Sequence, residues 1–246
     1  MKAGRALAVS YVASSAMADS AASPVAGAKG QTRLVAPDPR QRAIARRAAE
    51  SRATVPDIEL TTEVSVEAPA ALLARRECSL TALLVRSCAL ALRDVPRANA
   101  AYRDGRFELY SRVNVGFSVC TEDAYVVPTV FDADRKSLAQ CGAETDELRR
   151  RALAGELAPP ELSGATFTLT DLSATGIVAA SPVIPPSQAA ALTAGAIRER
   201  PVARDGVLHS VPTLTLSLAC DHRIVYWSHA AALLDRIGEL LSQAAL

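Results

Sequence analysis

The stretch that decides the fold reads LTLSLACDHRIV and covers residues 214–225. Apolar and hydroxyl residues alternate from Thr213 to Ala219, a period typical of a strand that turns one face to the core. Asp221, His222 and Arg223 follow at the end of this strand. A histidine at a strand end can act as a general base, because imidazole titrates near neutral pH. On residue types alone, a purely structural histidine fits better than a general base.

Two further segments alternate in the same way. Residues 113–119 place valines and Phe117 on one side, with Asn114, Gly116 and Ser118 on the other. Residues 166–170 read TFTLT, and residues 59–66 alternate in part. These segments predict strands.

Helical spacing of apolar residues indicates the other elements. It predicts helices at 38–52, 79–94, 137–154 and 228–244, and the proline pair before Ser187 favours a short helix at 187–192. Strands and helices mix without regular alternation, and no internal repeat is visible. The order therefore predicts an α+β fold with a mixed sheet and flanking helices.

Length and charge limit the classes of protein that remain. The chain has 246 residues and a formal net charge of +1. One domain of this size can bury a large core, so we expect a flexible arm rich in Ala, Ser and Gly at 1–32 and a single domain at 33–246. Near-neutral charge argues against nucleic acid as a partner. The most apolar stretch, residues 80–92, is too short to span a bilayer, so we expect no membrane association.

The cysteines and histidines do not indicate a metal site. Five cysteines are scattered through the chain without ligand spacing, and only three histidines accompany them. Buried thiols of a cytoplasmic protein are the simplest interpretation. The sequence also lacks a phosphate-binding glycine loop and a nucleophile elbow.

The DHR stretch resembles the C-terminal motif of the dihydrolipoyl acyltransferase core of 2-oxoacid dehydrogenase complexes, which shares its fold with chloramphenicol acetyltransferase. Further segments of that core are resembled, in the same order, by residues 33–60, 95–105, 113–138, 162–177, 181–195 and 197–206. The resemblance runs from Arg33 to the end of the chain. It implies an α+β domain of that type, assembled as a homotrimer with active sites between subunits.

The resemblance also implies roles for particular residues. His222 occupies the position of the family's base, the histidine that deprotonates the acyl acceptor or the CoA thiol. Thr170 occupies the position of the family's hydroxyl residue, which stabilises the oxyanion during direct acyl transfer. Arg135 and Lys136 fall near the CoA channel of relatives, although a solvated helix start explains them equally well. Acetyl-CoA is then a co-substrate, and no permanently bound cofactor is expected.

One departure from the family motif concerns the residues after the histidine. Tyr226 and Trp227 stand where the family has an acidic or amide residue and a glycine. Together with missing lipoyl and cage-forming segments, this favours a free-standing trimeric O-acetyltransferase that acetylates a small-molecule alcohol, as in tetronate biosynthesis, with the two rings lining the acceptor site. The alternatives are a dihydrolipoyl acyltransferase core and a catalytically silent trimeric scaffold.

Overall fold

The structure, a computed structural model, describes residues 25–75, 78–121 and 124–243. It divides into two compact units that meet in sequence at Pro39 and Arg40. In the first unit, β1 (Val25–Gly27) and β2 (Gly30–Thr32) form an antiparallel hairpin. The expected flexible arm at 1–32 therefore lies mostly outside the described residues, and its last part is this hairpin. The domain boundary at 33 stays a prediction.

A mixed sheet forms the centre of the second unit. Its strands follow the order β12-β13-β11-β10-β6-β9, and β3 pairs with β13 as well. Their bounds are β3 Asp57–Ser65, β6 Val115–Phe117, β9 Thr129–Val130, β10 Phe167–Asp171, β11 Ala190–Ala194, β12 Arg198–Arg204 and β13 Val207–Asp221.

Strand β13 organises the sheet because it pairs along its whole length. Its first part forms a hairpin with β12, and its second part lies between β3 and β11, antiparallel to both. Strand β10 runs parallel to β11 and to β6. Two smaller hairpins pair β4 (Ala100–Arg103) with β5 (Arg106–Leu109), and β7 (Val119–Cys120) with β8 (Tyr125–Val126).

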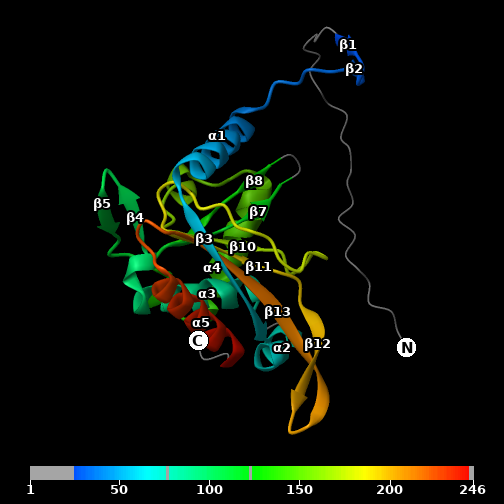
Figure 1. Ribbon diagram of the computed structural model, residues 1–246, viewed down its shortest axis with the longest axis vertical. Coiled ribbons are helices and arrows are strands. Elements are labelled where there is room, and N and C mark those ends of the chain that lie inside the picture. Colours follow the sequence, from blue (N-terminus) through cyan, green and yellow to red (C-terminus); the bar gives the residue numbers. More distant parts are fainter. Residues whose placement is uncertain (1–24, 76–77, 122–123, 244–246) are drawn as a thin grey trace. The chain divides into compact units, whose positions relative to one another are not determined.

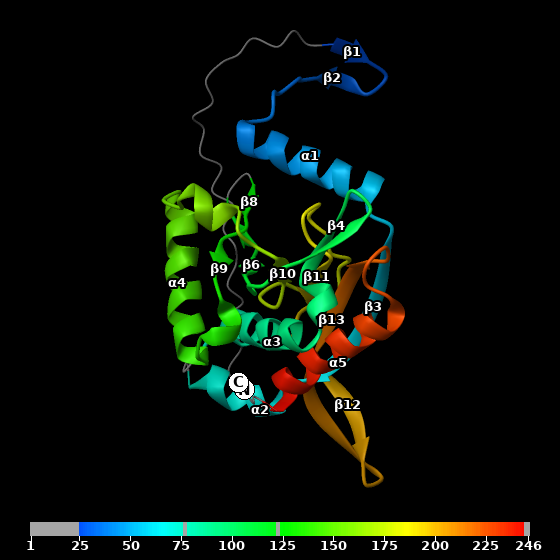
Figure 2. The ribbon, with the colours of Figure 1, turned by 90° about the vertical axis from the view of Figure 1, so that its left-hand side faces the viewer.

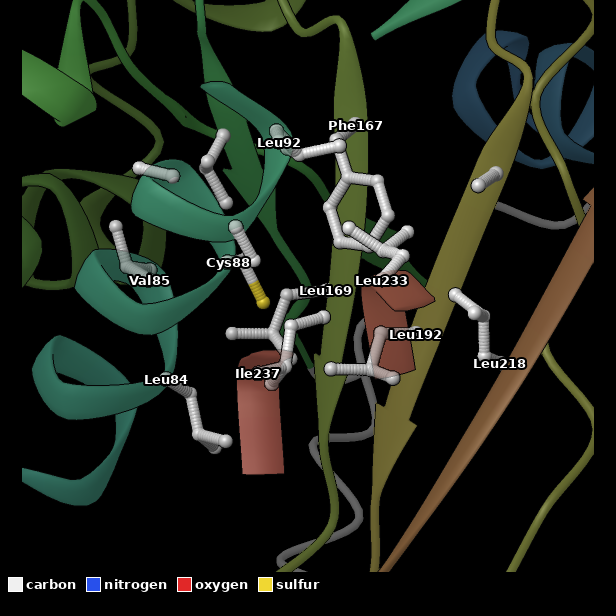
Figure 3. Close-up of a cluster of buried hydrophobic side chains, with 14 of the residues drawn as sticks. Leu84, Val85, Cys88, Leu92, Phe167, Leu169, Leu192, Leu218, Leu233 and Ile237 are labelled. Carbon is white, nitrogen blue, oxygen red and sulfur yellow. The ribbon is translucent and has the colours of Figure 1, made fainter. Parts of the chain in front are cut away.

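Helices cover one face of the sheet. Figure 2 shows α3 and α5 lying in front of β10, β11 and β13, with α4 beside them. The core between these layers is mostly aliphatic, with Phe167 among its side chains, and Leu84, Cys88, Leu169, Leu192 and Ile237 point toward one another in Figure 3. In chain order, the α-helices of the described residues are α1 Pro39–Thr54, α2 Glu67–Ala74, α3 Leu80–Asp94, α4 Leu138–Ala154 and α5 Trp227–Gln243. The short 3-10 helices are η1 Pro96–Ala98, η2 Ala133–Arg135 and η3 Pro159–Leu162.

Side-chain caps explain where two of these helices begin. The Ser79 hydroxyl accepts a hydrogen bond from the Ala82 amide at 3.2 Å, which starts α3. Ser137 and Gln140 form a reciprocal capping box at the start of α4. Gly155, with φ 74°, ends α4 in the left-handed region that favours glycine. The predicted starts at 79 and 137 agree with these caps.

The opposite face of the sheet carries the hydroxyl residues and is covered by the loop at residues 172–188. The amide of Ala196 donates to the carbonyl of Ile177 at 2.7 Å, where the loop meets the end of β11. A side chain at Gly195 would place its Cβ 1.8 Å from the Val178 carbonyl oxygen. This close approach allows the loop to lie directly on the strand.

The α+β prediction is confirmed, but the short helix predicted at 187–192 is wrong. Residues 190–194 form β11, which is fully buried between β10 and β13. A short apolar run that is buried on both faces has no alternation, so periodicity cannot separate it from a helix. Among the described residues, no helix has the length and apolar character needed to cross a membrane.

Figure 1 shows the β12-β13 hairpin extending beyond the helical layer. Both of its strands are exposed along most of the hairpin, and Leu208 near its tip is 74% exposed. Only the inner part of β13 could be predicted from the sequence, because the outer part has no buried face to impose a period of two.

Candidate active site

The end of β13 is fixed by a buried carboxylate. Asp221 is 1% exposed, and its carboxylate accepts hydrogen bonds from Arg223 Nε at 2.9 Å and Nη2 at 2.7 Å. The pKa of Arg223 is raised by the hydrogen bond from the Arg223 guanidinium to the Asp221 carboxylate. The guanidinium also lies over the Tyr102 ring, 4.5 Å from its centroid. Asp221 and Arg223 therefore hold the chain on both sides of His222.

His222 is held through both its backbone and its ring. Its amide donates to the Pro56 carbonyl at 2.9 Å, and Nδ1 lies 3.2 Å from the Val225 carbonyl oxygen. A carbonyl oxygen only accepts hydrogen bonds, so this contact requires the proton on Nδ1. In the neutral ring, Nε2 then carries the lone pair that a general base needs.

Two aromatic rings contact His222 edge-on. The centroids of Tyr226 and Trp227 each lie 5.9 Å from that of His222. Both rings are accessible, at 44% and 56% exposure. Arg97 lies over the Tyr226 ring at 5.2 Å from its centroid and over the Phe107 ring at 4.7 Å. We call His222, Tyr226 and Trp227 the histidine cluster.

Thr170 lies near the end of β10, on the sheet face that carries the hydroxyl residues. Its Oγ1 lies 3.1 Å from the Oγ of Ser118. The Ser118 amide donates to the Leu169 carbonyl at 2.9 Å, so the two backbones are joined beside these side chains. We call Ser118 and Thr170 the hydroxyl pair.

The core side of the same strand end is also tied down. The Asp171 carboxylate accepts from Thr81 Oγ1 at 2.7 Å and from the Ser173 amide at 3.0 Å. Thr81 Oγ1 in turn accepts from Arg149 Nη2 at 2.8 Å. Helices α3 and α4 therefore both brace the residue next to Thr170.

The strand register separates the hydroxyl pair from the histidine cluster within one copy of the chain. Thr170 pairs with Thr193, whereas the Asp221 amide donates to the carbonyl of Ala189, four residues earlier on the same strand. Four residues span about 13 Å along a strand, and the two strand spacings between β10 and β13 add about 10 Å across the sheet. His222 and Thr170 therefore cannot contact the same carbonyl group within one chain.

Arg135 and Lys136 lie after β9, at the edge of the sheet next to β6. Lys136 forms an ion pair with Glu144, whereas Arg135 is exposed at the end of η2. The four strand spacings between β9 and β13 correspond to about 19 Å. These two cations therefore belong to the half of the sheet that carries the hydroxyl pair.

Burial makes the cysteine beside the histidine cluster unreactive. Cys220 is fully buried, and this burial raises the pKa of its thiol to about 12. The Asp221 carboxylate acts in the same direction. The thiol therefore stays protonated near neutral pH and cannot compete with an incoming nucleophile.

Sequence reasoning identified the histidine cluster and Thr170 but missed Ser118 and Arg97 as neighbours of these residues. The alternation of residues 113–119 did place Ser118 on the polar side of its strand. Which hydroxyl it would face depended on the pairing of β6 with β10, a contact between segments about 50 residues apart. No local pattern placed Arg97 over Tyr226.

Comparison with known proteins assigns the family. The family described as 2-oxoacid dehydrogenases acyltransferase (catalytic domain) matches residues 29–246. The mitochondrial dihydrolipoyllysine-residue acetyltransferase component 3 of the pyruvate dehydrogenase complex of Arabidopsis thaliana is 34% identical, over 74% of this chain and 36% of that protein. The corresponding component of Bacillus subtilis is 33% identical, over 84% of this chain and 49% of that protein. The chain thus spans about a third to a half of these relatives.

Solved structures agree with these relatives. The dihydrolipoamide acetyltransferase of Azotobacter vinelandii superposes with a TM-score of 0.84 at 27% identity, over 91% of this chain and 97% of that chain. It was studied for the role of a serine, a histidine 52 positions later and an asparagine four positions after that histidine in its catalytic mechanism. A chloramphenicol acetyltransferase matches with a TM-score of 0.54 at 14% identity, over 80% of this chain and 94% of that chain, which shows likeness of fold alone.

The prediction of an O-acetyltransferase of tetronate biosynthesis, with a small-molecule alcohol as acceptor, is wrong. The similar curated proteins are dihydrolipoyllysine-residue acetyltransferases of pyruvate dehydrogenase complexes, which favours the alternative of a dihydrolipoyl acyltransferase core. The predicted family and the chloramphenicol acetyltransferase-like fold are confirmed. The chain belongs to the acyltransferase family of the 2-oxoacid dehydrogenases and carries the catalytic domain of that enzyme family.

Proposed function

We propose that the chain transfers an acetyl group between CoA and a dihydrolipoyl group, as the names of its relatives indicate. One observation carries this proposal. Thr170 and His222 are 52 positions apart, the same separation as the serine and histidine studied in the Azotobacter vinelandii enzyme. A hydroxyl group and an imidazole at matched positions supply the two functions that direct acyl transfer needs.

The chemistry follows from the tautomer of His222. Nε2 removes the proton from the attacking dihydrolipoyl thiol, and the thiolate sulfur forms a bond to the thioester carbon of acetyl-CoA. Thr170 donates a hydrogen bond to the oxygen that becomes negatively charged. The bond between the carbonyl carbon and the CoA sulfur then breaks, and the CoA thiolate takes the proton back from the imidazolium ion. The acetyl group moves directly, without a covalent enzyme intermediate.

A second copy of the chain completes this site. The register puts His222 and Thr170 too far apart within one copy, so the histidine cluster of one subunit faces the hydroxyl pair of a neighbour. A homotrimer meets this requirement with three equivalent interfaces, each containing one site. The similarity to acyltransferase cores of multienzyme complexes supports an assembled state.

CoA approaches from the half of the sheet that carries the hydroxyl pair. Arg135 is exposed there and supplies a cation for the CoA phosphates. Lys136 contributes less, because its ammonium group already pairs with Glu144. Acetyl-CoA is a co-substrate in this scheme, and the lipoyl group arrives on another domain or protein.

The acceptor side differs from that of the Azotobacter vinelandii enzyme. Tyr226 stands four positions after His222, where that enzyme has an asparagine. We assign Tyr226 and Trp227 to the walls of the acceptor channel, because both rings are exposed and both contact His222. An aromatic wall offers the aliphatic lipoyl chain an apolar surface.

Acetyl transfer from acetyl-CoA to dihydrolipoamide tests the proposal. The full chain is assayed for S-acetyldihydrolipoamide by mass spectrometry, beside His222→Ala and His209→Ala. His209 is an exposed histidine of the β12-β13 hairpin and serves as a matched control. We expect His222→Ala to lose at least about 100-fold in kcat and His209→Ala to retain activity. Equal activity in both variants would remove His222 as the base, and no transfer by the unmodified chain would refute the function.

A further inference from the structure

The hydroxyl pair contains a residue to which the transfer mechanism gives no role. We propose that Ser118 is a positioning residue that orients the Thr170 hydroxyl toward the substrate carbonyl oxygen. This inference rests on the proposed function. It starts from the contact between Ser118 Oγ and Thr170 Oγ1 at 3.1 Å, a normal hydrogen-bond length in which either atom can be the donor.

Proton accounting selects the donor. Thr170 has one hydroxyl proton, and oxyanion stabilisation requires that this proton point at the substrate oxygen. The Thr170 oxygen then has lone pairs left to accept, so Ser118 must donate. In the reverse arrangement, the Thr170 hydroxyl would donate its proton to Ser118 Oγ and could not donate it to the substrate oxygen. Catalysis therefore requires one order, from Ser118 to Thr170 to the substrate.

The surrounding backbone makes this contact geometrically fixed. Leu169 and Phe117 pair in the parallel β10-β6 ladder and are both buried on the core side. The residues that follow them, Thr170 and Ser118, therefore point together to the opposite face. The hydrogen bond from the Ser118 amide to the Leu169 carbonyl at 2.9 Å closes the ladder at this point.

The environment allows the pair to act on a ligand. Both side chains are partly buried, so a substrate can reach them while bulk water competes less than at the surface. A donor to the Thr170 oxygen also polarises its O–H bond and makes that hydroxyl a better donor in turn. Asp171, which Thr81 and Ser173 hold, keeps the strand end from shifting.

A double-mutant cycle tests the role. Ser118→Ala, Thr170→Ala and the double variant are assayed with acetyl-CoA and dihydrolipoamide. We expect Thr170→Ala to lose about 100-fold in kcat. Ser118→Ala should lose about five- to tenfold in kcat, with KM for acetyl-CoA within about twofold. In the Thr170→Ala background, Ser118→Ala should cost nothing further, because the hydroxyl that it orients is gone.

Two controls separate this role from a structural one. Ser118→Thr keeps a hydroxyl at the position and should restore most of the activity. Thr121→Val removes a hydroxyl three positions after Ser118 that donates to the Ala124 carbonyl at 3.0 Å, and it should leave kcat unchanged. Thermal unfolding of each variant shows whether the fold is intact.

The outcomes distinguish the two proposals. If the unmodified chain transfers acetyl groups and Ser118→Ala matches it, the role of Ser118 is refuted while the function stands. A loss that persists in the Thr170→Ala background would overturn positioning, because Ser118 would then act independently. If Thr170→Ala keeps full activity, there is no donor to orient and the inference falls. Absence of transfer by the unmodified chain would refute both.

Discussion

At the scale of the residue, the orientation of His222 depends on groups that take no part in proton transfer. The Val225 carbonyl selects the tautomer, and the Asp221 carboxylate holds Arg223 next to the histidine. Asp221 is buried and accepts hydrogen bonds from Arg223 Nε and Nη2, and these bonds hold the guanidinium over the Tyr102 ring. In the proposed mechanism, the DHR motif thus supplies both the base and the ion pair that positions it.

Tyr226 carries a prediction about the acceptor. Tyr226→Asn, which introduces the residue of the Azotobacter vinelandii enzyme, removes a ring that contacts His222 and Arg97. We expect the KM for dihydrolipoamide to rise about fivefold, since a partly exposed aromatic contact contributes about 1 kcal/mol. The KM for acetyl-CoA should stay within about twofold. Steady-state kinetics with each substrate varied in turn measures both.

Tyr125→Asn provides the control, because Tyr125 is 43% exposed, close to the 44% of Tyr226, and lies on a different hairpin. The fluorescence of Trp227, the chain's one tryptophan, offers a second measurement beside the same histidine. A rise in the KM for acetyl-CoA alone would place Tyr226 on the donor side and contradict the assignment.

At the scale of the element, local pattern explains which parts of the fold could be predicted. Helices α3 and α4 have apolar stripes and capping residues, and apolar and hydroxyl residues alternate strictly in the inner part of β13. Each of these elements can therefore be predicted from its own residues. Strand β11 has no alternation because both of its faces are buried, and β12 has none because it is exposed. The positions of these two strands are set by pairing with distant segments.

The same reasoning applies to the site. His222 and Thr170 could be identified because each lies in a motif that resembles a family, and Tyr226 because it departs from that motif. Ser118 and Arg97 reach the site residues through contacts between distant elements, so no single stretch of sequence predicts their positions. The spacing between the histidine cluster and the hydroxyl pair follows only from the register of β10, β11 and β13.

The loop at residues 172–188 carries a prediction about stability. Gly195→Ala would place a methyl group 1.8 Å from the Val178 carbonyl oxygen, so the loop must move off the strand. We expect the free energy of unfolding to fall by about 2–3 kcal/mol, as measured by urea titration. Gly142→Ala is the matched control, because its new Cβ would lie in ordinary contact 3.9 Å from Ala82 and favour α4. Equal stability of both variants would show that the loop does not need this close approach.

An ion pair at the end of α4 carries a prediction about pH. The hydrogen bond from Arg151 holds the pKa of Glu161 below the usual value of a glutamate, and the hydrogen bond from the Ala158 amide acts in the same direction. A lowered carboxyl pKa stabilises the fold at pH values above about 4.5, and this contribution is lost as the pH falls through the lowered value. Glu161→Gln should therefore reduce Tm by about 2 °C at pH 7 and by progressively less below pH 4.5.

Calorimetry across pH 3–7 measures this difference. Glu147→Gln is the comparison, because Glu147 pairs with Arg150 but both side chains are more than half exposed and solvent screens their attraction. It should change Tm less than Glu161→Gln does. A difference for Glu161→Gln that grows as the solution becomes more acidic would contradict the sign of the shift.

At the scale of the whole molecule, one sheet carries two half-sites. The histidine cluster lies where β13 ends, and the hydroxyl pair lies on the β6-β10 side, so the proposed mechanism needs both parts brought together. If two neighbouring subunits join these halves, activity depends on assembly. An isolated subunit should then be folded and inactive.

Subunit mixing tests this arrangement directly. His222→Ala and Thr170→Ala are each expected to be nearly inactive, because every interface in either assembly lacks one of the two groups. When equal amounts are unfolded, mixed and refolded, about a quarter of the interfaces of a trimer should pair an intact His222 with an intact Thr170. We therefore expect acetyl transfer to recover to about a quarter of the activity of the unmodified chain treated in the same way. Mixing two samples of His222→Ala is the control, and recovery no greater than in that control would mean that each site is built within one chain.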